Sequence, residues 1–136
     1  MIWLPVSSLY AGLGALLMIA LAARIPPLRR RHHVGINSGG REDLALAMRA
    51  HGNAVENLPL GLLMLGLLEI QGISPAWLYA IGGLLLLGRL LHAWGLSLSA
   101  GKTFGRFWGM VLTWLSLLIM AGMLIWLALP LSQSSL

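Results

Sequence analysis

The sequence has no cysteine and very little charge. Without cysteine, the chain cannot form a disulfide framework, a thiolate metal site or a cysteine nucleophile. Only 10% of the residues are charged, against about 25% in a soluble domain. Because 58% are hydrophobic, disorder is excluded and a water-soluble globule is strongly disfavoured. A chain of 136 residues with this composition predicts one small membrane domain.

Long uncharged or nearly uncharged runs are what the sequence has in quantity. Four of them reach the roughly 20 residues that a membrane-spanning helix needs. They cover about residues 3–23, 44–70, 77–98 and 107–131. The alternating pattern of a β-barrel is absent. The first run has no basic stretch before it, so we interpret it as a retained helix rather than a signal peptide. We expect residues 1–136 to form a single all-α domain, an antiparallel bundle of four transmembrane helices.

The basic residues gather in two of the three short connections. The Pro26-Pro27 pair in the first connection is expected to break the chain after the first helix. The positive-inside rule places the first and third connections in the cytoplasm and both termini on the other side. The net charge of +5 is therefore interpreted as a topology signal, and no nucleic-acid partner is expected. The basic residues concerned are Arg24, Arg29, Arg30, Arg31 and Arg41, then Lys102 and Arg106.

Polar residues interrupt the second and third runs at membrane depth, where ionisable groups are costly and usually functional. At 100° per residue, Arg49, Asn53 and Glu56 share one face of the second helix. Arg89 and His92 lie one turn apart on the third helix.

The depth of these residues suggests a pairing. Glu56 lies about 18 Å and Arg89 about 14 Å from the cytoplasmic ends of their helices, so the two are predicted to form an ion pair. One interpretation is a structural ion pair that, with an amide clamp, holds the two helices together. The surplus of polar residues on the second helix favours instead a polar cavity that opens to the cytoplasm.

The second-helix segment Arg49-Ala-His-Gly-Asn53-Ala-Val-Glu56-Asn-Leu-Pro59 resembles the signature of the MAPEG family, membrane-associated proteins in eicosanoid and glutathione metabolism. The third-helix stretch from Arg89 to His92 also looks like that family. The resemblance extends over the whole chain in length, helix count and loop pattern. It is nearest to the small bacterial members, which implies an integral protein of the bacterial inner membrane.

The resemblance implies a homotrimer that contacts membrane lipids and binds glutathione between subunits near the cytoplasmic side. A lipophilic small-molecule substrate would enter from the bilayer. Arginines bind carboxylates by paired hydrogen bonds, a glutamate can receive an ammonium group, and a nearby cation lowers a thiol pKa. Carried over by position, the cofactor-binding residues are Arg49, Asn53, Glu56, Arg89 and His92, with Arg89 holding a carboxylate or orienting Glu56. Arg106 or Arg24 would lie near the thiol as the catalytic group.

Two positions depart from the family pattern. Leu96 stands where animal enzymes often have a tyrosine, and Gly52 stands where some relatives have a second arginine. The leading hypothesis is a glutathione-dependent transferase or peroxidase acting on lipophilic electrophiles. The alternative is a non-catalytic lipid-binding or scaffold protein. A third hypothesis is a small transporter that uses Glu56 as its proton site.

Three weaker motifs have simpler interpretations. The adjacent His32 and His33 lack a third ligand, so no metal site is expected. The three arginines at positions 29–31 could bind anionic lipid or a glutathione carboxylate, but a topology signal is the favoured interpretation. Gly105 and Gly109 are spaced for close helix packing.

Overall fold

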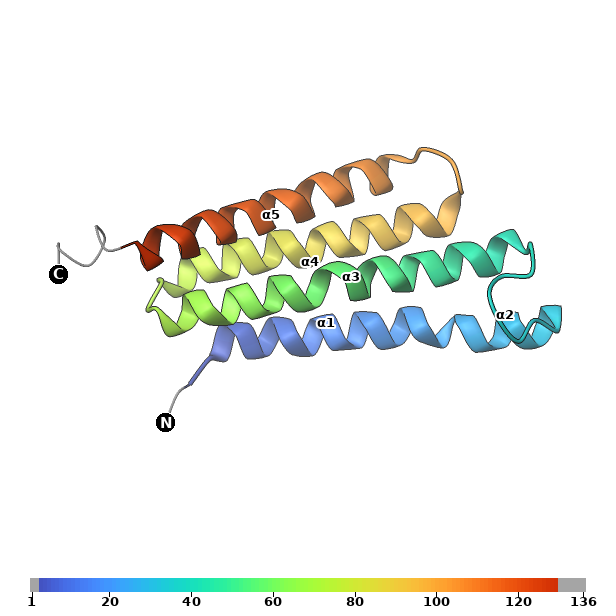
Figure 1. The fold of residues 1–136 in the computed structure, drawn as a ribbon, viewed down its shortest axis with the longest axis horizontal. Helices are drawn as coiled ribbons and strands as arrows, with labels where there is room; N and C mark the ends of the chain where they lie inside the picture. The colour runs from blue at the N-terminus through green and yellow to red at the C-terminus, as the bar shows by residue number, and fades with distance from the viewer. Residues whose placement is uncertain (1–2, 130–136) are drawn as a thin grey trace.

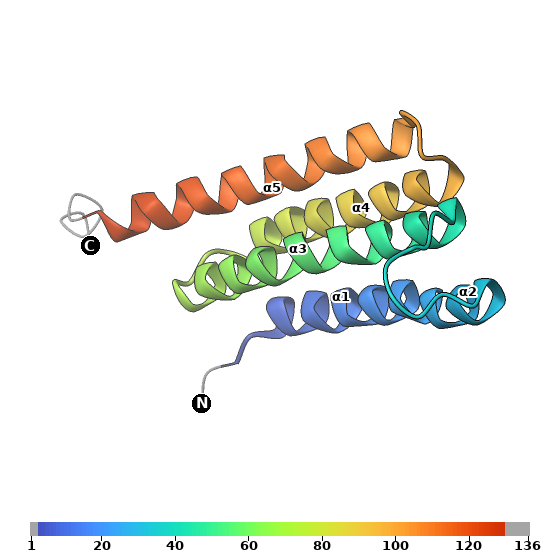
Figure 2. The same ribbon diagram turned by 45° about the vertical axis from the view of Figure 1, so that its right-hand side comes forward.

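The computed structural model describes residues 3–129, and these form an all-helical bundle. The helices are α1 (Pro5–Ala23), α2 (Ile25–His32), α3 (Glu42–Ile70), α4 (Pro75–Leu98) and α5 (Phe104–Ala128). Four stretches are long and apolar enough to cross a membrane, and α1 and α2 together make the first of them. Figure 1 shows α1, α3, α4 and α5 lying side by side in alternating directions, and Figure 2 shows the same arrangement from another side. The predicted four-helix transmembrane architecture is confirmed.

The first connection differs from its prediction, because Pro26 and Pro27 do not break the helix. Arg24 keeps helical backbone angles, with φ −73° and ψ −22°, and α2 continues α1 along nearly the same line (Figure 1). The prolines stand in the first turn of α2, where a missing backbone N–H costs no hydrogen bond. The helical part of this segment is therefore 28 residues long, from Pro5 to His32.

The other helix boundaries lie within a few residues of those predicted. α3 begins at Glu42 and runs through Pro59 as one helix, and α4 begins with Pro75 in its first turn. α5 begins earlier than predicted, at Phe104, because Thr103 caps it by accepting a hydrogen bond from the backbone N–H of Arg106 at 3.3 Å. The predicted end of this helix at residue 131 lies outside the described residues.

The two basic connections lie at the same end of the bundle. In both views α2, the loop after it and the α4–α5 connection gather at one end (Figures 1 and 2). The α3–α4 turn, the start of α1 and the end of α5 lie at the other end. The basic residues of the first and third connections therefore share one end, as the charge pattern predicted. We call this end the basic end of the bundle.

α4 is the central helix of the bundle. Half of the 18-residue apolar stretch of α4 is buried, against 33% of the matching stretch of α3 and 17% each for the first helical stretch and α5. The buried apolar core comes mainly from α3 and α4, with Val6, Leu21 and Met120 added by the outer helices. Arg89 and His92 of α4 are consequently held inside the protein.

Glycines let α4 and α5 approach each other closely. A Cβ atom at Gly109 would lie 2.5 Å from the backbone nitrogen of His92 and 2.6 Å from the carbonyl oxygen of Gly88. Gly105 is similarly placed, 2.6 Å from the carbonyl oxygen of Leu91. The packing role predicted for Gly105 and Gly109 is confirmed, and Gly88 on α4 is a partner that the sequence analysis missed.

We expect Gly109→Ala to destabilise the bundle, because the added methyl group meets backbone atoms that cannot move aside. Overpacking of this kind costs about 1–3 kcal/mol. Gly122→Ala is the matched control, since a Cβ atom there meets nothing within 4 Å on the same helix. Unfolding in detergent measures both variants. Equal stability of the two would contradict the close contact.

Candidate functional site

Arg89 on α4 is buried at the centre of the bundle, with 2% of its surface exposed. Its Nε donates to the Thr113 hydroxyl at 2.7 Å, and its Nη2 donates to the Gly109 carbonyl at 3.2 Å. Its Nη1 donates to the side-chain oxygen of Asn53 on α3. Among the described residues, its hydrogen-bond acceptors are all uncharged. The predicted Glu56–Arg89 ion pair is therefore wrong.

The prediction failed because the polar stripe of α3 divides between two directions. Asn53 is buried and faces Arg89, whereas the side chains of Arg49 and Glu56 are 63% and 55% exposed. Asn53 and Glu56 differ by about 60° around the helix at 100° per residue. That rotation places the amide inside the bundle and leaves the carboxylate outside. Arg49 Nη1 lies 3.3 Å from Glu56 Oε1, so these two exposed residues pair with each other.

The amide clamp that the sequence suggested exists without the carboxylate. The backbone oxygen of Asn53 accepts from the Asn57 side chain at 2.8 Å and from Arg89 at 3.5 Å. Its side-chain oxygen also accepts a hydrogen bond from Arg89. The side-chain N–H groups of Asn53 therefore remain as donors for a ligand. Thr113 and Gly109 complete the clamp from α5. Thr113, polar but uncharged within an apolar run, was the sequence signal that could have found it.

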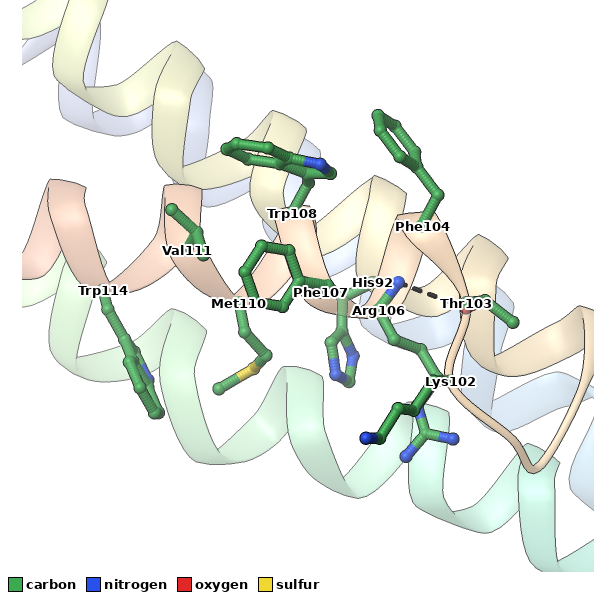
Figure 3. A pocket seen from close by; sticks show the side chains of 10 residues that line it. All are labelled: His92, Lys102, Thr103, Phe104, Arg106, Phe107, Trp108, Met110, Val111 and Trp114. Atoms are coloured by element: carbon green, nitrogen blue, oxygen red, sulfur yellow. Dashed lines mark hydrogen bonds between the residues drawn. The ribbon is translucent and has the colours of Figure 1, made fainter.

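A cavity of about 680 Å³ lies against α5. Figure 3 shows Lys102 and Arg106 together at one end of this groove and Trp114 at the other. Most of the wall between them is aromatic or apolar, and His92 lies between the two ends. We call this the aromatic groove. Its lining residues are His92, Lys102, Thr103, Phe104, Arg106, Phe107, Trp108, Met110, Val111 and Trp114.

The two candidate thiol-activating arginines lie in different cavities. Arg106 lines the aromatic groove, and its guanidinium donates to the carbonyl oxygens of Ala100 and Gly101 in the preceding turn. Arg24 donates to the Ser97 hydroxyl at 2.6 Å and lines a separate cleft of about 400 Å³. Within one chain, only Arg106 therefore shares a cavity with His92.

The predicted polar cavity on the second helix is present only in part. A cavity of about 380 Å³ at the start of α3 includes Arg49, and neither Glu56 nor Asn53 lines it. The aromatic groove is larger than this cavity, and the sequence did not indicate it. Leu96, at the position where animal enzymes of the family often have a tyrosine, is buried in the core.

The adjacent histidines form no metal centre in the structure. His32 Nε2 lies 2.8 Å from Asp43 Oδ2, which joins α2 to the start of α3. Residues 3–129 contain no group of three or more metal-type ligands.

Comparison with known proteins identifies the family. A model described as the MAPEG family matches residues 7–126. The chain belongs to the MAPEG family. It is 36% identical over 121 residues to "Inner membrane protein YecN" of Escherichia coli strain K12, an alignment covering 89% of this chain and 91% of that protein. The protein of the same name from Escherichia coli O6:H1 matches with the same identity and coverage.

Family membership confirms the resemblance inferred from the motif between Arg49 and Pro59. Within this family member, the structure brings Asn53 and Arg89 into direct contact and holds Arg49 and Glu56 outside the bundle. The assignment of these residues and of His92 to glutathione stays a prediction.

We expect Thr113→Val to destabilise the protein, because it removes the acceptor of the Arg89 Nε–H while keeping the side-chain shape. A hydrogen bond to a charged group contributes about 1.5–3 kcal/mol. Thr113→Ser is the control, since it keeps the hydroxyl. Denaturant unfolding of the detergent-solubilised variants measures the difference. The clamp would be contradicted if the valine variant matched the serine variant.

Proposed function

We propose that this chain is an integral inner-membrane protein that binds glutathione between the subunits of a homotrimer and reacts it with lipophilic electrophiles or hydroperoxides. The observation that carries the proposal is the Arg49–Glu56 pair. It stands on the outer face of α3, at a depth where a membrane protein would otherwise meet hydrocarbon.

The depth of this pair argues for a covering surface. Counted back from Ile70, about 20 residues fill the hydrocarbon layer. Glu56 then lies roughly 9 Å inside that layer and Arg49 near its boundary. The neighbouring Val55 and Leu60 are exposed apolar residues. A carboxylate that faces lipid is costly, so we infer that a second copy of the chain covers this face. This supports the proposed homotrimer.

The exposed pair suits the charges of glutathione, which has two carboxylates and one ammonium group. The Arg49 guanidinium can bind a carboxylate through two parallel hydrogen bonds, and the Glu56 carboxylate can accept the ammonium group. The 3.3 Å contact between the two side chains is solvent-exposed, and exposed ion pairs are weak, so a ligand can replace it. Asn53 can add an amide N–H donor to the peptide link.

Arg89 supports this arrangement from inside the bundle. Its side-chain donors contact Asn53, Thr113 and Gly109. In the proposed site, Arg89 therefore fixes the orientation of the Asn53 amide, rather than that of Glu56.

The aromatic groove supports a role for Arg106 beside the thiol. Glutathione, when bound, would supply the thiol that acts as the nucleophile. A guanidinium beside a thiol lowers the thiol pKa and raises the fraction of thiolate at neutral pH. The aromatic walls of the groove, including Phe107 and Trp114, offer an apolar surface to a substrate arriving from the bilayer. Arg24 stays a second candidate, since its cleft lies at the same end of the bundle.

The proposed location is supported by the name of a relative, and the proposed orientation by the distribution of basic residues. The Escherichia coli relative carries the name inner membrane protein. The positive-inside rule places the basic end of this bundle in the cytoplasm, with both termini on the opposite side.

A non-catalytic lipid-binding or scaffold function is the alternative. The burial of Leu96 favours it, because no hydroxyl can reach a ligand from the position where the animal enzymes often have a tyrosine. The same aromatic groove would then hold a lipid without turnover.

Calorimetric titration of the detergent-solubilised protein with glutathione tests the cofactor. We expect binding by the wild-type protein and affinity losses of about tenfold or more for Arg49→Gln and Glu56→Gln, since each removes a charge-assisted contact. Arg41→Gln is the control, an exposed arginine at the start of the same helix. The absence of heat up to millimolar glutathione would overturn the assignment.

Turnover separates the enzyme from the scaffold. With a chlorinated aromatic or a lipid hydroperoxide, we expect Arg106→Gln to reduce the rate at neutral pH by about tenfold, the effect of one pKa unit. Removing the cation raises the thiol pKa, so the rate profile moves to higher pH. Glutathione binding without any wild-type turnover would support the scaffold.

A further inference from the structure

A second cleft at the basic end of the bundle is separate from the Arg49–Glu56 pair and from the aromatic groove. It has a volume of about 400 Å³ and lies between the end of the first helical stretch, the start of α3 and the end of α4. Its lining residues are Arg24, Pro27, Leu28, Asp43, Leu46 and Ser97. We call it the headgroup cleft, and we propose that it binds the phosphodiester of an anionic membrane phospholipid.

Arg24 lines the cleft, and Arg31 lies on the same helix face two turns further along. Arg24, Pro27, Leu28 and Arg31 follow the spacing i, i+3, i+4 and i+7, which places them along one side of the continuous α1–α2 helix. Arg31 is exposed and does not line the cleft itself, but its place on this face brings its charge to the edge of the cleft. The Cα atoms of the two arginines lie roughly 10 Å apart along the axis, on either side of the apolar pair Pro27 and Leu28.

The depth of the cleft matches the headgroup layer. α1 has 19 residues, which span about 28 Å at 1.5 Å per residue. Because the hydrocarbon core is about 30 Å thick, Arg24 lies near the phosphate level and α2 extends into the headgroups. Leu28 and Leu46 give the cleft an apolar wall for the start of an acyl chain.

The charge around the cleft favours an anion. Asp43 is the acidic residue of its lining, and its two carboxylate oxygens already accept from the Leu44 N–H and contact His32, each at 2.8 Å. Arg31 makes no hydrogen bond or ion pair with any residue from 3 to 129, so its guanidinium is available. Arg29 differs from Arg31, since it donates to the carbonyl oxygens of Val34 and Asn37 and holds the loop after α2.

Lipid retention tests this proposal. The protein is reconstituted with a mixture of phosphatidylglycerol and phosphatidylcholine, and the lipids that stay bound after extraction are counted by native mass spectrometry. We expect retention of phosphatidylglycerol over phosphatidylcholine. The double variant Arg24→Gln/Arg31→Gln should lose this preference, by about fivefold for each arginine removed.

The matched control is Arg30→Gln/Arg41→Gln, which removes the same charge at the same end of the bundle but outside both the cleft and the aromatic groove. We expect it to keep most of the preference. Arg31→Gln alone breaks no hydrogen bond of the described chain, so it gives a folded test if the double variant fails to fold. Equal retention of both lipids by the wild-type protein would overturn the proposal. So would an equal loss in the control, which would show a general effect of surface charge.

Discussion

The burial of one guanidinium group without a charged partner determines how this bundle is built. Arg89 lies at the centre of the fold and needs acceptors on several sides. It finds them on both neighbouring helices, through Asn53 on α3 and through Thr113 and Gly109 on α5. Because a buried cation left without these acceptors would be costly, the three helices are fixed relative to one another. The glycines between α4 and α5 allow the backbone of α5 to come close enough to take part.

Because uncharged groups accept all the hydrogen bonds of Arg89 within residues 3–129, the carboxylate of Glu56 lies outside the core. Glu56 is not used in the core, and together with Arg49 it forms a charged pair on a face that is otherwise apolar. In a membrane such a face is incomplete, which gives a physical reason for both an oligomer and a polar ligand at the same place. The aromatic groove and its two cations lie towards the basic end, where the headgroup cleft also opens.

Much of the fold could be predicted from the sequence, because each apolar run is longer than a strand and long enough to span a bilayer. The effect of Pro26 and Pro27 could not be predicted, since a proline pair either breaks a helix or begins one and the sequence does not say which. The similar depths of Glu56 and Arg89 suggested an ion pair, but Glu56 lies about 60° around the helix from Asn53, the residue that faces Arg89. Helical periodicity also cannot tell which apolar face meets lipid and which lines a groove, so the residues around Trp114 were missed.

In the proposed assembly, another copy of the chain covers the outer face of α3. A single spin label at Leu63→Cys, on this exposed face, tests it directly because the chain has no native cysteine. If another copy covers this face, the labels show dipolar coupling in lipid vesicles. The coupling is lost when labelled protein is diluted with unlabelled protein before reconstitution. Absence of coupling, together with free access of oxygen to the label from the bilayer, would contradict this assembly.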